Sequence, residues 1–551
     1  MGIRFFLAIG LITAVSCKKT DNDPAPSPGS GTFSFVASSI NGNNSGSFTY
    51  QNISTNPEIR LSFSAPVDRN TATAITLAEN SGGAVATAAS FANSDSTVIL
   101  KPAAMKAFLT YLLTLPVSLK SKSGTAIKST LTFTLKTGID SSRKFPLITD
   151  DALLTLVQQQ TFKYFWDFGH PVSGLSRERN NSNDVVTSGG SGFGIMAIVT
   201  GIHRGFITRA EGLARIQKMA GFLKTAQKFH GAFPHWLNGA TGNVVPFSQK
   251  DNGADLVETS YLMQGLLTAR QYFNGADPAE TTLRNDINTL YNGVEWSWFR
   301  KGAENVLYWH WSPDYNWEMN LPIRGWNECL ITYALAASSP TYGIPPSVYT
   351  SGWAVSPSFV NGNTYYGYKL PLGPVLGGPL FFAHYSFLGI NPNGLTDSYG
   401  NYFEQNKNHT LINYNYSRAN LKGHYGYSDS VWGLTASDIP NGYTASSPTN
   451  DIGVIAPTAA LSSFPYTPTE SMQALKFYYY VLGDKIWKEY GFVDAFALKD
   501  PWFASSFLAI DQGPIIIMIE NHRSKLLWNL FMSCPEVKTG MKVLGFQSPY
   551  F

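Results

Sequence analysis

The strongest constraint on the fold is the alternation of two kinds of apolar segment over residues 146–551. Segments such as 208–229 carry apolar residues at helical spacing on one side only. Others are apolar almost all round, namely 194–202, 256–273, 329–337, 379–388, 472–482 and 514–532. A helix with one apolar face lies on the outside of a fold, and one that is apolar all round is buried. The alternation predicts six inner helices ringed by six outer ones, a mainly α (α/α)6 toroid.

Two long stretches rich in glycine and proline, 340–375 and 423–465, interrupt this pattern. Loops of that length in a compact domain often carry function. Before the helical region, residues 32–138 contain short alternating runs, such as 59–63 and 131–135, between turn residues. Roughly seven such runs predict a small all-β, immunoglobulin-like sandwich. We find no catalytic constellation in it and expect a spacer or a wall beside a cleft.

The first residues of the chain predict export and a lipid anchor. The apolar run 5–15 is too short for a permanent membrane helix and is typical of a signal peptide. Residues 14–17 are similar to a lipobox, which predicts a signal peptide over 1–17, a lipidated Cys17 and a tether over 18–31. An ordinary signal peptide with an incidental cysteine is the alternative. We expect secretion across the inner membrane and anchoring in the periplasm or at the outer membrane and cell surface.

Composition limits the class of ligand. The net charge is +3, only 14% of residues are charged and no Lys/Arg block occurs, which argues against nucleic acid. Aromatic residues reach 14%, with 13 Trp, a surplus that suits a sugar-binding cleft. Cys329 and Cys534 stand in apolar helical segments and are predicted to be buried thiols.

Motifs for other chemistries are missing from the sequence. The nine histidines show no zinc-site spacing, the glycine-rich run 189–194 lacks the phosphate-loop lysine, and no nucleophile-elbow motif occurs. We therefore expect no metal and no cofactor, and a monomeric protein that meets the membrane only through its lipid anchor.

Acidic residues stand at the starts of the apolar segments. Asp251, Asp255 and Glu258 are spaced i, i+4, i+7, which predicts one helical face, and crowded acids raise one another's pKa as acid catalysis requires. A capping box made by Asp255 and Glu258 is the alternative. Glu328 and Asp511 open two other apolar segments, where each could be a first-turn acid or a cap. Because the inner helices of a toroid begin at one end, we expect all five acids to meet at one cavity.

Aromatic and polar residues flank these acids and are candidates for substrate binding. Tryptophans between turn residues indicate stacking on sugar rings, with core packing as the alternative. An arginine in the polar loop 175–180 could bind hydroxyl groups or form a surface salt bridge. The candidates are Arg177, His235, Trp236, Asn252, Trp311, Arg324 and Trp326.

Taken together, these motifs resemble the bacterial glucoamylase-like glycoside hydrolases. The segments that carry the resemblance are 156–168, 174–179, 233–239, 251–259, 324–328 and 511–514. The similarity is closest to glycoside hydrolase family 144, which contains endo-β-1,2-glucanases and relatives that release sophorose from chain ends. The resemblance implies an (α/α)6 toroid, inversion of anomeric configuration and a pocket lined by the five acids. The additional Ig-like module, which resembles those of bacterial surface proteins, leaves endo or exo action open.

An inverting hydrolase needs a protonated carboxyl group and a carboxylate on opposite sides of the bond, about 6.5–9.5 Å apart. The pair should therefore come from different segments. We expect Glu328 to be the acid, because its apolar neighbours should raise its pKa. The base would be Asp255 or Asp511, while Asp251 and Glu258 hold hydroxyl groups or tune their neighbours.

Three alternatives remain open from the sequence. A polysaccharide lyase could share the toroid, but it needs a Tyr/His pair and usually a basic groove. A glycan-binding lipoprotein without activity would need the tryptophans but not the acids. A glucoamylase-type hydrolase of another glucan would keep both.

Overall fold

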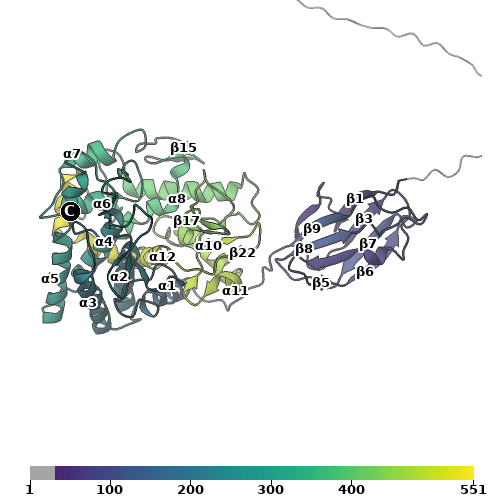
Figure 1. The fold of residues 1–551 in the computed structure, drawn as a ribbon, viewed down its shortest axis with the longest axis horizontal. Coiled ribbons are helices and arrows are strands. Elements are labelled where there is room, and N and C mark those ends of the chain that lie inside the picture. Colours follow the sequence, from purple (N-terminus) through teal and green to yellow (C-terminus); the bar gives the residue numbers. More distant parts are fainter. Residues whose placement is uncertain (1–31) are drawn as a thin grey trace, which may run out of the picture. The chain divides into compact units, whose positions relative to one another are not determined.

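The computed structural model describes residues 32–551, which form two compact units that meet between Asp140 and Ser141 (Figure 1). The predictions for the signal peptide, Cys17 and the tether lie outside the described residues. Within the described part, no helix has the length and apolar character needed to cross a membrane.

The first unit is a sandwich of two β-sheets. One sheet has the order β1-β3-β7-β6, with β1 (Phe35–Ile40), β3 (Ile59–Phe63), β7 (Thr97–Pro102) and β6 (Thr87–Ala92). The other has the order β2-β9-β8-β4-β5, with β2 (Thr49–Ile53), β9 (Leu131–Thr137), β8 (Thr110–Leu115), β4 (Thr76–Glu79) and β5 (Ala84–Val85). The β2–β9 pair is parallel, and the other pairs in both sheets are antiparallel.

Alternation along the strands builds the core of this unit. In β3, Ile59, Leu61 and Phe63 are buried, whereas Arg60 between them is exposed. The buried residues of both sheets form one apolar cluster, because successive side chains of a strand point to opposite faces.

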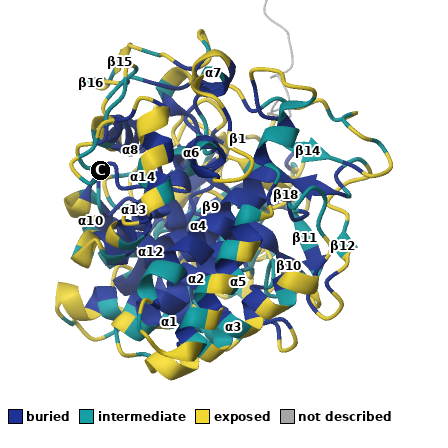
Figure 2. Ribbon diagram, turned by 90° about the vertical axis from the view of Figure 1, so that its left-hand side faces the viewer, coloured by how far each residue is buried: buried dark blue, intermediate teal, exposed yellow. Residues whose placement is uncertain are grey.

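The second unit is mainly helical, and its buried helices are α2, α4, α6, α9 and α12. Figure 2 shows α2, α4 and α12 dark blue along most of their length, whereas α3 and α5 also carry exposed residues. Helix α2 packs against both α4 and α12. The bounds of the buried helices are α2 (Ser188–His203), α4 (Leu256–Tyr272), α6 (Leu330–Ser338), α9 (Pro457–Leu461) and α12 (Ala509–Ser524).

The remaining longer helices bury one side. A complete capping box starts α3, since the side chains of Thr208 and Glu211 each accept a hydrogen bond from the other's backbone amide. These helices are α1 (Asp150–Trp166), α3 (Arg209–Thr225), α5 (Pro278–Asn292), α8 (Tyr402–Ala419), α10 (Pro468–Tyr480), α13 (Leu526–Met532) and α14 (Pro535–Val543).

Glycines allow the backbones of α2 and α4 to touch. A Cβ atom on Gly192 would overlap the carbonyl oxygen of Tyr261, and one on Gly265 would overlap the carbonyl oxygen of Gly192. This close approach brings together the N-terminal turns of both helices, where polar residues stand.

Three details of the helix prediction are wrong. Residues 379–388 form two short 3-10 helices, η5 (Leu380–Ala383) and η6 (Ser386–Leu388), instead of one helix. Side chains of other helices bond their carbonyl groups: Gln264 donates to Tyr385 O, Asn521 to Leu388 O and Trp528 to Phe387 O. These bonds replace the helical ones and hold the segment in place.

The other two details concern helix ends and the choice of inner helix. The segment 514–532 is divided at Lys525, whose left-handed backbone ends α12 before α13 begins. The segment 472–482 falls in α10, which buries one face only, while the fully buried short helix is α9, inside the stretch expected to be loop. Cys329 and Cys534 are both free and buried, as predicted.

Candidate active site

Asp255 stands at the N-terminus of α4, held there by backbone pairing on one side and helix capping on the other. The two-residue strands β13 (Ala254–Asp255) and β14 (His310–Trp311) pair antiparallel, so that His310 lies opposite Asp255. Oδ1 of Asp255 accepts hydrogen bonds from the amides of Val257 and Glu258, at 3.0 and 2.9 Å. His310, the middle residue of the sequence WHW at 309–311, is therefore a partner of Asp255, the N-cap of α4.

Two imidazoles contact the other oxygen of Asp255. Oδ2 lies 3.1 Å from Nδ1 of His235 and 3.4 Å from Nε2 of His310. Burial alone would raise the pKa of Asp255, but the two imidazoles outweigh it and hold that pKa below its usual range. Asp255 therefore stays ionised near neutral pH.

Asp251 approaches the same imidazoles from the loop before β13. Its Oδ2 lies 3.3 Å from Nε2 of His310. Burial and the neighbouring carboxylate of Asp255 raise the pKa of Asp251 to about 6. For His235, burial opposes the charged form, but Glu258, Asp255 and Asp251 outweigh it and raise the pKa of the imidazole to about 9.

The three acids at the start of α4 do not share a helical face, contrary to prediction. Asp251 lies in a loop, Asp255 is the N-cap with an extended backbone, and only Glu258 is inside the helix. Only the Asp255 half of the capping box forms. Oε2 of Glu258 instead accepts hydrogen bonds from the amide of Gly189, at 2.8 Å, and from the hydroxyl of Thr187. Glu258 thereby ties the start of α4 to that of α2, and burial raises its pKa.

Glu328 comes from a different segment, just before α6. It is half-buried, and its backbone carbonyl accepts a hydrogen bond from the hydroxyl of Ser386. Burial, helped by the carboxylates of Asp255 and Glu258, raises the pKa of Glu328 to about 7. A carboxyl group in this state is protonated at mildly acid pH and can still give up its proton, as a general acid must.

The phenol of Tyr385 marks the place where the acids converge. Burial, followed by the negative charge of Asp511, Glu328 and Glu258, raises the pKa of this phenol well above its usual range. Three of the five predicted acids therefore lie near one buried phenol, but none of the five lines the two cavities described below, so their convergence at one cavity stays a prediction.

Asp511 does not cap α12, because the N-cap residue is Leu508 and Asp511 lies in the first turn. Its carboxyl group instead pairs with that of Asp494, and both are buried. Burial and the proximity of the two carboxyl groups raise the pKa of Asp511 well above normal and that of Asp494 to about 7. The pair therefore holds a proton at neutral pH.

A cavity of about 330 Å³ opens beside His235. Arg179 is fixed in its wall by Glu178 at 2.9 Å and by Asp438 at 3.3 Å. A second cavity, of about 460 Å³, is also lined by Arg179 and Tyr443, so the two cavities adjoin at these residues. The first is lined by Glu178, Arg179, Thr187, His235, Trp236, Phe247, Tyr443, Leu508 and Ile510.

Of the predicted substrate-binding residues, His235 and Trp236 line the cavity. Their rings pack against Phe247, which stacks on His235 with ring centres 4.3 Å apart. Trp311 is half-buried against Trp298, and Arg324 is exposed outside the cavity lining.

Three other candidates have their polar groups or rings engaged elsewhere. Arg177 donates to the carbonyl oxygens of Asn183 and Phe168, so it fixes a loop, and Arg179 lines the cavity in its place. Asn252 bonds to Ser312 and Asp314, which joins two loops. Trp326 is buried among aromatic rings, including Trp353 and Phe387, and belongs to the core.

Several residues of the site were not predicted from the sequence. His310 lies between two tryptophans that were interpreted for stacking, and only strand pairing places its ring on Asp255. Asp438, Tyr443 and Asp494 come from the long stretch 423–465 and beyond, where the unusual length was the available signal.

Comparison with known proteins identifies both units. A family model described as "Putative glucoamylase" matches residues 320–535, and one for a bacterial Ig-like domain matches residues 41–137.

Solved structures of relatives match most of the chain. The endo-β-1,2-glucanase from Chitinophaga pinensis, solved with sophorotriose and glucose, is 53% identical, with a TM-score of 0.72, over 74% of this chain and 100% of its own. A β-1,2-glucanase from Parabacteroides distasonis is 40% identical, with a TM-score of 0.71, over 93% of this chain and 73% of its own.

A curated relative carries a more specific name. It is the exo-β-1,2-glucooligosaccharide sophorohydrolase (non-reducing end) from Parabacteroides distasonis, 50% identical over 424 residues. These cover 73% of this chain but 59% of the relative, so the chain matches less than two thirds of that protein.

Proposed function

Since the chain belongs to the bacterial glucoamylase-like glycoside hydrolases, we propose that it hydrolyses β-1,2-glucan, with inversion at the anomeric carbon. The observation that carries the proposal is the contrast between Glu328, whose pKa is raised to about 7, and Asp255, whose pKa is held below normal. Environments that drive two carboxyl groups apart in pKa assign one as acid and the other as base. The names of the relatives supply the substrate.

Glu328 donates the proton to the leaving oxygen in this mechanism. Its carboxyl group is half-buried and lies near the carboxylates of Asp255 and Glu258, whose charge favours the protonated form. As the glycosidic bond breaks, the proton moves to the departing sugar oxygen and Glu328 becomes ionised.

Asp255 is the base. It remains ionised because His235 and His310 stabilise its charge, and Oδ2 is the atom that accepts the proton of the attacking water. The base needs a free electron pair, and the Asp494–Asp511 pair holds a proton, which disfavours Asp511 in this role. Asp251 tunes the imidazoles, and Glu258 positions α4 against α2.

The cavity and its aromatic rim bind the sugar. Trp236 and Phe247 offer ring faces, and Arg179, fixed by two carboxylates, presents guanidinium donors to hydroxyl groups. Product analysis distinguishes cleavage at chain ends from cleavage within the chain.

We further propose that the helices of the second unit close into an (α/α)6 toroid. The support is that α4 and α12 both pack on α2, and that Gly189, Glu258 and Asp511 stand in the first turns of α2, α4 and α12. We also propose that the protein is exported and carries a lipid on Cys17, which anchors it in the periplasm or at the outer membrane and cell surface. The support is the sequence of residues 1–31.

Release of reducing ends from four polymers tests the proposal. The full chain is incubated with linear β-1,2-glucan, laminarin, starch and a uronate polymer. We expect sophorose or longer sophoro-oligosaccharides from the first and little from the others. Strong starch hydrolysis without β-1,2 cleavage would identify a true glucoamylase, and an unsaturated product from the uronate polymer would identify a lyase.

A further inference from the structure

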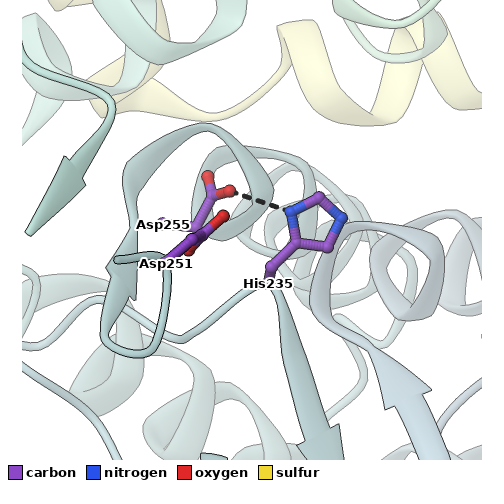
Figure 3. A group of neighbouring side chains, drawn as sticks. All are labelled: His235, Asp251 and Asp255. Carbon is purple, nitrogen blue, oxygen red and sulfur yellow. Dashed lines mark hydrogen bonds and ion pairs between the residues drawn. The ribbon is translucent and has the colours of Figure 1, made fainter. Parts of the chain in front are cut away.

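Two histidines and two aspartates meet at the start of α4. Oδ2 of Asp255 lies 3.1 Å from Nδ1 of His235 and 3.4 Å from Nε2 of His310, and the same Nε2 lies 3.3 Å from Oδ2 of Asp251. Ligating atoms of His235, Asp251 and Asp255 all lie within 4.8 Å of one another. Figure 3 shows the two carboxyl groups side by side next to the ring of His235.

These positions fit part of a coordination sphere around a small cation. Zinc binds imidazole nitrogen and carboxylate oxygen at about 2.0–2.2 Å, so neighbouring ligand atoms lie about 3.3–3.6 Å apart. The His235–Asp255 separation of 3.1 Å is close to this range, and a ligand atom of Asp251 lies within 4.8 Å of both. His310 contacts the carboxylates of Asp251 and Asp255 at 3.3 and 3.4 Å, and the short β13–β14 pairing fixes its backbone and that of Asp255 before a cation arrives.

Asp251 supplies an independent sign of a missing partner. The residue is 4% exposed, and its Oδ1 has no hydrogen-bond partner within the described part of the chain. A buried carboxylate oxygen without a donor is costly, and a cation would compensate for that cost.

We propose that His235, Asp251 and Asp255 bind one zinc-type divalent cation, with His310 positioning the two carboxylates, and that the bound cation inhibits the enzyme. An imidazole and two carboxylates suit Zn²⁺ and its transition-metal neighbours, whereas Mg²⁺ and Ca²⁺ prefer oxygen ligands alone. The side chain of His235 is 24% exposed and lines the cavity, which gives the cation a path of entry.

Inhibition follows from the atoms that the cation occupies. Bound to Oδ2 of Asp255, it uses the electron pair that the base offers to water, and it sits where the water would be activated. The inhibitory part of the inference rests on the proposed function, whereas cation binding does not.

Calorimetry on the metal-stripped full chain, without substrate, tests binding directly. We expect one Zn²⁺ per chain and at least tenfold weaker binding of Mg²⁺. His310→Gln should weaken Zn²⁺ binding at least tenfold, and His235→Gln should do the same. His203→Gln is the matched control, since His203 pairs with a carboxylate, Glu520, at the other end of α2; it should bind like the unaltered protein.

Two further measurements separate the possible failures. Co²⁺ bound to the unaltered protein should give the visible absorption of a site with nitrogen and oxygen ligands. This absorption should be lost in His235→Gln, with circular dichroism verifying that the variant is folded. Zn²⁺ should stop glucan hydrolysis and a chelator should restore it. Absence of Zn²⁺ binding, or binding by folded His310→Gln and His235→Gln as tight as that of the unaltered protein, would overturn the site. Zn²⁺ binding without any hydrolysis of β-1,2-glucan would refute the proposed function but not the site.

Discussion

At the scale of single residues, Glu328 and Asp255 show how different surroundings give two carboxyl groups very different pKa values. Glu328 has no cationic partner among the groups that shift its pKa, and burial raises that pKa to about 7. Asp255 is more deeply buried, but two imidazoles and two backbone amides stabilise its negative charge. The type and segment of both acids could be predicted from the sequence, because each begins an apolar segment.

The partners of these acids could not be predicted in the same way. His310 reaches Asp255 only because β14 pairs with β13, strands separated by α4 and α5. Asp494 reaches Asp511 from a separate segment. Arg177 and Arg179 stand in the same polar loop, so the sequence alone does not show which of them lines the cavity. Local sequence predicts which residues are buried, but tertiary contacts decide which charges meet.

Glu328→Gln should lower kcat by several orders of magnitude while the protein remains folded, because glutamine cannot protonate the leaving oxygen. Steady-state kinetics on β-1,2-glucan, with circular dichroism as the folding control, measures this. Glu295→Gln makes the same chemical change at a carboxylate that pairs with His230, and it should leave kcat within about twofold. Near-normal turnover of Glu328→Gln would reduce that residue to a helix-terminal acid.

The pH dependence should report the same carboxyl group. A general acid works only when protonated, so kcat/KM should fall as pH rises through about 7, the pKa of Glu328. Asp255, whose pKa is lowered, should impose no loss near neutral pH. A pH–rate profile from 4 to 10 measures the alkaline limb, and an activity that stays constant up to pH 9 would exclude Glu328 as the acid.

At the scale of elements, the contact of α2 with α4 sets the geometry of the site. The segments 194–202 and 256–273 were predicted as buried helices from their uniform apolar character, and both are. The segment 379–388 has the same character but forms 3-10 turns, because Gln264, Asn521 and Trp528 bond its carbonyl groups. Apolar composition predicts burial, whereas the hydrogen-bond partners of a segment decide its conformation.

Gly192→Ala tests the importance of this helix contact. The added methyl group would meet the backbone of Tyr261, and we expect a loss of about 3 kcal/mol in the free energy of unfolding. Gly221→Ala is the control, since its Cβ would meet nothing within 4 Å on exposed α3, and it should stabilise by about 0.5–1 kcal/mol. Denaturant unfolding measures both. Equal stability of the two variants would show that α2 and α4 can separate without cost.

At the scale of the whole molecule, the sequence predicted an all-β unit followed by a helical one, and the structure has both. The alternating strands of the first unit could be recognised because buried and exposed residues change places at every step. The inner helix α9 could not, because five residues give too short a pattern.

Attachment to the membrane is a property of the chain as a whole. If Cys17 is lipidated, Cys17→Ser should move the protein from the membrane fraction to the soluble fraction, because acyl chains supply the hydrophobic attachment. Fractionation of cells that express either form measures the change. A variant that still sediments with membranes would contradict lipid anchoring at this residue.

The most direct test of the central claim is the anomeric form of the first product released from linear β-1,2-glucan, followed by NMR. In the proposed mechanism Asp255 activates water on the face opposite to Glu328, so one displacement should convert the β-linkage into an α-anomeric reducing end. The α-anomer should therefore appear first and then equilibrate. Initial release of the β-anomer would show retention of configuration, and it would contradict the acid and base roles given to Glu328 and Asp255.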